Sequence, residues 1–189
     1  MKVFILLVAG LLSVGSAFGQ GTVVFANTAS PDFRIFTQTR LASGPMTGTN
    51  QWRIGLYVGN PGSSGGSLVL VGLATNASNP ALAGYFSGGN PFALPSPFQF
   101  GDTLTFQIRV WALAGGLSYE ESLRNGYLVG RSSLGFVTLG GGIVFPGPLF
   151  GTNPGQIGGF SAVAIPEPST YALGLLGAAL FGLLRRKRR

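Results

Sequence analysis

The chain has 189 residues, of which 46% are hydrophobic and only 9% are charged, and its formal net charge is +7. It contains no cysteine and no histidine. The lack of cysteine excludes disulfides and thiolate metal sites, and the lack of histidine excludes catalysis through a Ser–His or Cys–His pair.

The excess positive charge is concentrated at the two ends of the sequence. Lys2 and the five cations at positions 185–189 account for half of all Lys and Arg residues. Between them, six arginines and four acids leave a net charge of only +2, which is too small to steer an anionic partner strongly. An overall pI near 10.6 is typical of proteins that bind nucleic acids. Because the body of the chain carries little net charge, we nevertheless expect no nucleic-acid partner.

The N-terminal segment has the three parts of a secretory signal peptide. A lysine at position 2 supplies the positive start, residues 3–14 form a short apolar run, and small residues at Ala17 and Gly19 fit a signal-peptidase site. We expect cleavage before Gln20, with cleavage after Ala17 as the alternative. An uncleaved N-terminal anchor helix is a third interpretation, for which the apolar run is short.

Segments that read as β-strands follow along the body of the chain. In chain order, strands are expected at residues 21–27, 52–58, 68–75, 104–111, 134–139 and 159–164. Apolar and polar residues alternate most clearly in 52–58 and 104–111, which is the pattern of a half-buried strand. In 104–111, the even-numbered positions are expected to face the core.

Clusters of Gly, Pro, Ser and Asn separate the expected strands. They predict a loose hairpin at residues 60–67, an irregular crossing loop at 88–97, and further loops at 140–142 and 145–154. Many short strands joined by such turns are typical of a β-sandwich or a jelly-roll-like barrel. The 32 glycines and 12 prolines of the chain stay just below the ~25–30% that marks low-complexity sequence.

Only one segment of the body has helical character, at residues 118–125. Ser118 can serve as the N-cap, Glu121 occupies the capping-box position, and Gly126 can end the helix. The predicted organisation is a signal peptide at 1–19, a single all-β, sandwich-like domain with one short helix at 20–163, and a C-terminal segment with a hydrophobic helix at 164–189. A body of roughly 150 residues is long enough for one core.

The acids of the body are few, which argues against a catalytic or metal site. Glu120 and Glu121 are neighbours that would splay on a helix, whereas a glycosidase needs two carboxylates about 5–10 Å apart across a cleft. Asp32 and Asp102 are single acids, and calcium prefers six to eight oxygen ligands. We predict no catalytic activity, no cofactor and no metal site, with a structural calcium at a loop acid left as an alternative.

One group of side chains is a candidate contact for sugars. Trp111 and Arg109 share the polar side of their predicted strand, and Tyr119 and Tyr127 flank the short helix. Aromatic rings beside charged groups can stack on sugar rings. The alternative is that Trp111 packs beneath a covering element and has no ligand.

The C-terminal segment combines an apolar run with a basic end. The run begins at Tyr171 and ends at Leu184, so that it would span about 21 Å as a helix, against a hydrocarbon core of ~30 Å. It is therefore marginal as a permanent membrane anchor. The basic residues that follow are expected to stay on the cytoplasmic side, and they are Arg185, Arg186, Lys187, Arg188 and Arg189.

Immediately before this run stands the motif Pro166-Glu167-Pro168, followed by Ser169 and Thr170. The motif, the apolar run and the basic end, in this order, resemble the PEP-CTERM sorting signal of Gram-negative bacteria over roughly residues 164–189. The start of the body and the stretches around residues 108–111 and 118–121 are also similar to short exported proteins of this group. A plain C-terminal membrane anchor is the alternative interpretation.

The resemblance implies a route for the protein. Signal peptidase would act at the N-terminus, and an exosortase, a membrane-embedded transpeptidase-like enzyme, would recognise the C-terminal signal. The protein would pass through an inner-membrane intermediate and reach the cell surface or the extracellular matrix, where exopolysaccharide is a candidate partner. A non-catalytic surface or matrix protein is the leading expectation, and an exopolysaccharide-binding module is the alternative.

Overall fold

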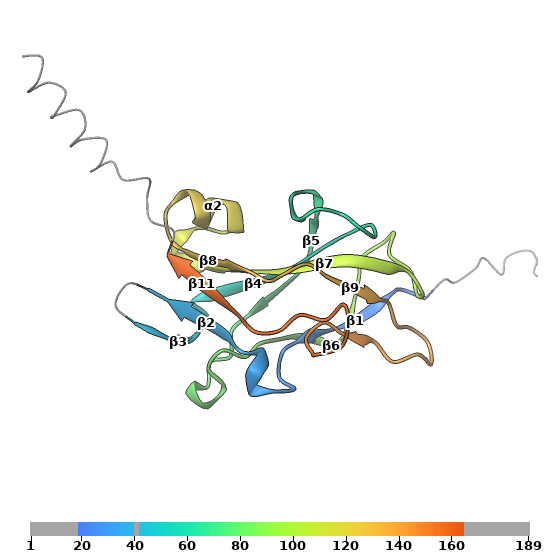
Figure 1. Ribbon diagram of the computed structural model, residues 1–189, viewed down its shortest axis with the longest axis horizontal. Helices are drawn as coiled ribbons and strands as arrows, with labels where there is room; N and C mark the ends of the chain where they lie inside the picture. The colour runs from blue at the N-terminus through green and yellow to red at the C-terminus, as the bar shows by residue number, and fades with distance from the viewer. Residues whose placement is uncertain (1–18, 40–41, 165–189) are drawn as a thin grey trace, which may run out of the picture.

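The computed structural model describes residues 19–39 and 42–164, which form two β-sheets packed against each other (Figure 1). The larger sheet has the strand order β3-β2-β11-β8-β7-β4-β5, and β9 pairs with β7 beside this path. The smaller sheet has the order β10-β1-β6. Two sheets and one short helix among the described residues confirm the predicted all-β, sandwich-like class.

The strands are short, as the turn-rich sequence predicts. Their bounds are β1 Thr22–Ala26, β2 Ile35–Gln38, β3 Ser43–Pro45, β4 Trp52–Gly59, β5 Val69–Thr75, β6 Ser87–Ala93, β7 Thr103–Ala112, β8 Leu128–Arg131, β9 Gly135–Thr138, β10 Gly147–Pro148 and β11 Phe160–Ala164. The helix α2 covers Tyr119–Arg124, and single 3-10 turns lie at Pro31–Phe33, Gly65–Ser67, Pro80–Leu82 and Leu113–Gly115.

At the centre of the large sheet, the alternation of apolar and polar residues correctly predicts which side chains face the core. β4 and β7 run antiparallel, with Ile54 opposite Val110 and Leu56 opposite Ile108. All four side chains are fully buried between the sheets. The expected strands at 21–27, 68–75, 134–139 and 159–164 also appear, as β1, β5, β9 and β11.

Phenylalanines join the small sheet to this core. The Phe25 ring of β1 makes edge contacts with Phe86, at 5.1 Å between ring centroids, and with Phe92, at 5.4 Å. Phe86 in turn contacts Phe150 at 5.8 Å. Edge-to-face pairs of this kind add to the free energy gained from burying the rings.

The prediction of an irregular crossing loop at residues 88–97 is wrong for residues 88–93. Ser87–Ala93 forms β6, which pairs antiparallel with β1. β6 lies at the edge of the small sheet, where the missing N–H of Pro91 removes no bond from a central ladder. The pairing shifts register around Phe25 and Gly89, which is how the glycine-rich stretch is accommodated.

Candidate functional site

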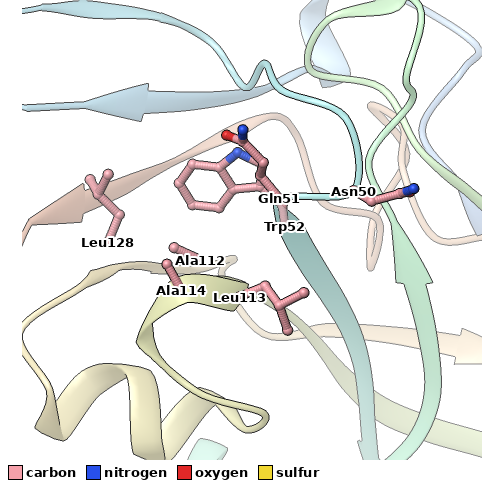
Figure 2. A pocket seen from close by; sticks show the side chains of 7 residues that line it. All are labelled: Asn50, Gln51, Trp52, Ala112, Leu113, Ala114 and Leu128. Carbon is pink, nitrogen blue, oxygen red and sulfur yellow. The ribbon is translucent and has the colours of Figure 1, made fainter.

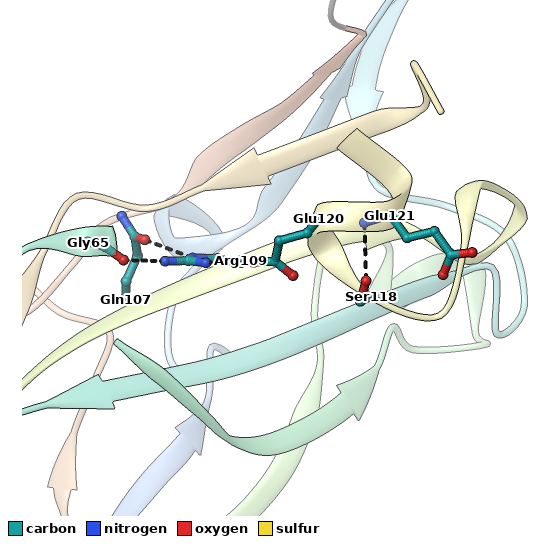
Figure 3. A network of polar contacts seen from close by, with 6 residues as sticks. All are labelled: Gly65, Gln107, Arg109, Ser118, Glu120 and Glu121. Atoms are coloured by element: carbon teal, nitrogen blue, oxygen red, sulfur yellow. Dashed lines mark hydrogen bonds and ion pairs between the residues drawn. The ribbon is translucent and has the colours of Figure 1, made fainter. Parts of the chain in front are cut away.

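The polar side of β7 carries a cluster centred on Arg109, which we call the Arg109 cluster and define as Arg109, Gln107, Glu120, Tyr57 and Tyr119. The guanidinium donates from Nε to Gln107 Oε1 at 3.0 Å and from Nη1 to Glu120 Oε1 at 3.1 Å. It also donates from Nη2 to the carbonyl of Gly65, in the turn between β4 and β5. Figure 3 shows Gln107, Gly65 and Glu120 converging on this one side chain.

The rings of two tyrosines also lie close to the same guanidinium. Its central carbon lies 4.1 Å from the centroid of Tyr57 and 5.3 Å from that of Tyr119. These are cation–π distances. Only 11% of the Arg109 side chain is exposed. Its guanidinium therefore interacts mainly with neighbouring residues of the domain and little with solvent.

Burial changes the acidity of both rings. The pKa of Tyr57 is raised above its ordinary 10.0, first by desolvation and then by the nearby Glu120 carboxylate, against the opposing charge of Arg109. The pKa of Tyr119 is raised by desolvation too, while Arg131 and Arg109 oppose it. Both phenols are therefore neutral at physiological pH and carry no charge for a ligand.

The short helix α2 places Glu120 within reach of Arg109. Ser118 caps the helix by accepting the Glu121 N–H at 3.1 Å, as the sequence predicts. Glu121 then accepts the N–H of Leu117 at 2.8 Å, one residue earlier than in the ordinary capping box. Gly126 follows the helix with φ of 70°, the left-handed conformation expected of a terminator.

Trp111 does not take part in an exposed face, which corrects its place among the candidate sugar contacts. Its side chain is 0% exposed, and its Nε1 is buried without a hydrogen-bond partner. A Cβ built at Gly55 on the adjacent strand would lie 3.1 Å from the indole, so the ring packs over a position that has no side chain. Trp111 therefore packs beneath its neighbours, which is the alternative raised by the sequence.

The two tyrosines among the candidate sugar contacts have different surroundings. Tyr119 is half-buried beside Arg109, whereas Tyr127 follows α2 and is 44% exposed. Tyr127 packs closely on Gly115, since a Cβ at that glycine would come within 2.6 Å of the tyrosine Cβ. The fold thus brings Arg109 and Tyr119 together, while Trp111 is covered and Tyr127 lies at the helix end.

The acids among the described residues each have a local partner. Asp102 accepts the Gln99 N–H at 2.8 Å, and Asp32 lies 3.4 Å from the Ser30 hydroxyl. Glu120 and Glu121 are used in the contacts with Arg109 and Leu117 described above. Within residues 19–39 and 42–164, no group of three His, Cys, Asp or Glu side chains is placed to share a metal ion.

A separate apolar pocket lies where β4 begins and β7 ends, and we call it the end pocket. It has a volume of about 610 Å³ and is lined by Asn50, Gln51, Trp52, Ala112, Leu113, Ala114 and Leu128. Figure 2 shows the Trp52 indole among these side chains, with Ala112 and Ala114 beside it and Leu128 across from them. The alternation in the sequence predicted the inward-facing Trp52 but not the pocket next to it.

Several predicted features lie outside the described residues. They are residues 1–18 of the signal peptide, the sorting motif at Pro166, Glu167 and Pro168, the apolar run from Tyr171 to Leu184 and the basic end. Within the part of the chain that the structure describes, no helix is both long and apolar enough to cross a membrane.

Comparison with known proteins identifies the C-terminal segment. The model of the PEP-CTERM protein-sorting motif matches residues 164–189. Neither a search of curated proteins nor a search of solved structures found a match for the chain. The motif supports export through the membrane to the cell surface and processing by an exosortase-like enzyme. The chain thus carries a PEP-CTERM protein-sorting signal at its C-terminus, which supports an exported protein.

Proposed function

We propose that this protein is a non-enzymatic component of the cell surface or extracellular matrix. The sorting motif at 164–189 is the observation that carries the proposal, because it assigns the chain to a surface destination. The signal peptide at 1–19 starts export, and signal peptidase removes it before Gln20. The apolar run then lodges in the inner membrane, with the basic end on the cytoplasmic side, until the exosortase-like enzyme acts.

The chemistry of the domain supports a role without catalysis. The chain has no histidine and no cysteine, and the guanidinium of Arg109 contacts five neighbours. The carboxylates among residues 19–39 and 42–164 are each engaged in a local contact instead of facing one another across a cleft. A packed domain held by such contacts is suited to a structural or binding role.

Cell fractionation tests the sorting route. The full chain, a form that lacks residues 166–189, and a variant with alanines at Pro166, Glu167 and Pro168 are expressed in the native host. The third form keeps the apolar run and the basic end, so it separates recognition of the motif from simple anchoring. We expect full-length protein at the surface or in the medium and the alanine variant retained in the inner membrane.

Two results of the fractionation would count against the route. If the truncated form distributes as the full chain does, the C-terminal segment is inert. If the alanine variant reaches the surface as the full chain does, the Pro166-Glu167-Pro168 motif is not required for sorting. A screen of the surface fraction against polysaccharide substrates tests the absence of catalysis, and turnover by the purified protein would refute it.

A second candidate function is contact with exopolysaccharide, and the exposed ring of Tyr127 favours it. The ring is 44% exposed and stands at the end of α2, whose Glu120 side chain is also exposed. A glycan array with the parent protein, a Tyr127→Ala variant and a Leu134→Ala control tests this candidate. Binding lost only in Tyr127→Ala supports the contact, and no binding by the parent disposes of it.

A further inference from the structure

The loop between β9 and β10 exposes an apolar tip, which we define as Ile143, Val144, Phe145 and the neighbouring Phe100. Ile143 is 99% exposed and Phe145 is 92% exposed, while Val144 and Phe100 are each 49% exposed. Single exposed apolar residues are ordinary, but a contiguous group of large ones usually marks an interaction surface.

The tip has a defined shape. Gly141 and Val144 exchange two backbone hydrogen bonds, each 3.0 Å long, so that Ile143 stands at the end of a closed turn. Gly142 takes a φ of 56° in this turn, which a glycine adopts without strain. No residue from 132 to 164 is charged, so the surroundings of the tip on its own segment are neutral as well.

The end pocket lies at the opposite end of the domain. It is lined by Trp52, which pairs with Ala112 at the end of β7. The tip follows β9, whose Thr138 pairs with Thr103 at the start of β7. Since β7 has ten residues, the two features are separated by roughly 30 Å at ~3.4 Å per residue, and Figure 1 shows the β9 side and the α2 side at opposite ends.

We propose that the apolar tip of one molecule inserts into the end pocket of a second copy of the same chain. The pocket is lined mainly by apolar side chains, carries no charged residue and is large enough for the ring of Phe145 together with Ile143. Asn50 and Gln51 at its rim supply amides for the polar backbone of the incoming turn. A protrusion and a pocket of matching apolar character on one molecule make a second copy the occupant.

The two surfaces differ, so the contact is heterologous and propagates from copy to copy instead of closing into a symmetric dimer. A contact limited to one turn and one pocket is expected to bury less than the ~1,200 Å² typical of stable complexes, so the association is expected to be reversible and concentration-dependent. The association uses only the described domain and does not rest on the proposed sorting route.

Crosslinking in the full chain tests this proposal without background, because the chain contains no cysteine. Ile143→Cys is combined with Ala114→Cys at the pocket, and a short bis-maleimide is added to the purified full chain at a series of protein concentrations. Both positions are exposed, and they lie too far apart on one molecule for an internal link. We expect a ladder of dimers, trimers and larger species on a denaturing gel.

Matched variants make the outcome decisive. Ile143→Cys combined with Leu134→Cys is the control, since Leu134 is exposed but does not line the pocket, and it should give no ladder. Adding Phe145→Ser to the first pair should reduce the ladder at least tenfold. The proposal is overturned if the first pair stays monomeric, if the control gives an equal ladder, or if Ile143→Cys alone gives tip-to-tip dimers.

Discussion

Ala164 at the end of β11 pairs in antiparallel register with Leu128 at the start of β8, and the sorting motif begins at this same alanine. β11 is an interior strand, with β2 on its other side. The signal is therefore attached directly to the large sheet, without a linker between the last strand and the motif.

Truncation after Ala164 is expected to leave the stability of the domain within about 0.5 kcal/mol of the parent, because it removes no strand. Truncation after Gly158 removes β11 and leaves β2 and β8 without a shared neighbour, so that form should not fold. Urea denaturation of both forms, followed by tryptophan fluorescence, makes the comparison. Equal stability of the two truncated forms would show that β11 is dispensable.

Phe25→Ala should be strongly destabilising. Its ring is fully buried and contacts Phe86 and Phe92, so its loss leaves a cavity between the sheets. We expect a loss of about 3–5 kcal/mol. Phe145→Ala, at a ring that is 92% exposed, is the matched control and should change the free energy of unfolding by about 0.5 kcal/mol or less.

Within the Arg109 cluster, the arginine should matter more than its acid partner. Glu120→Gln removes an ion pair whose acid side chain is 57% exposed, so we expect a cost below about 1 kcal/mol. Arg109→Lys loses the planar donor set that reaches both Gln107 and Gly65 and the stacking on Tyr57. A cost of about 1–3 kcal/mol is expected by urea denaturation, and a larger cost for Glu120→Gln would contradict this ranking.

Stability should fall at alkaline pH because of the buried phenols. The folded-state pKa values of Tyr57 and Tyr119 lie above 10.0, so the unfolded chain loses these protons first as the pH rises. Their contribution to stability is complete below pH 10.0 and decreases as the pH rises through the folded-state values. Tyr57→Phe should lessen this decrease, as measured by unfolding at a series of pH values, and an unchanged alkaline slope would contradict it.

The strands that the sequence predicts well are those with clear alternation. β4 and β7 place their apolar positions on one face, and that face is the core. β6 was missed because Pro91 and two glycines resemble a loop, and only its place at a sheet edge permits them. β3 and β10, with three and two residues, are too short for any period to be read.

The surroundings of the candidate site could not be predicted from the pattern of a single strand. Alternation placed Trp111 on the same side as Arg109 but could not show that this side is also covered. Burial of Trp111 depends on Gly55 across the ladder, and the partners of Arg109 come from Tyr57 and Gly65, both distant in sequence. Pairing between β4 and β7, once known, would have revealed Tyr57 opposite Gln107.

The intact mass of the protein recovered from the surface or medium of its native host tests export and sorting most directly. We predict a species that begins at Gln20 and ends near the Pro166-Glu167-Pro168 motif, with the apolar run and the basic end removed. Recovery from the cytoplasm of an unprocessed chain that runs from Met1 to Arg189 would contradict both processing steps and the proposed destination.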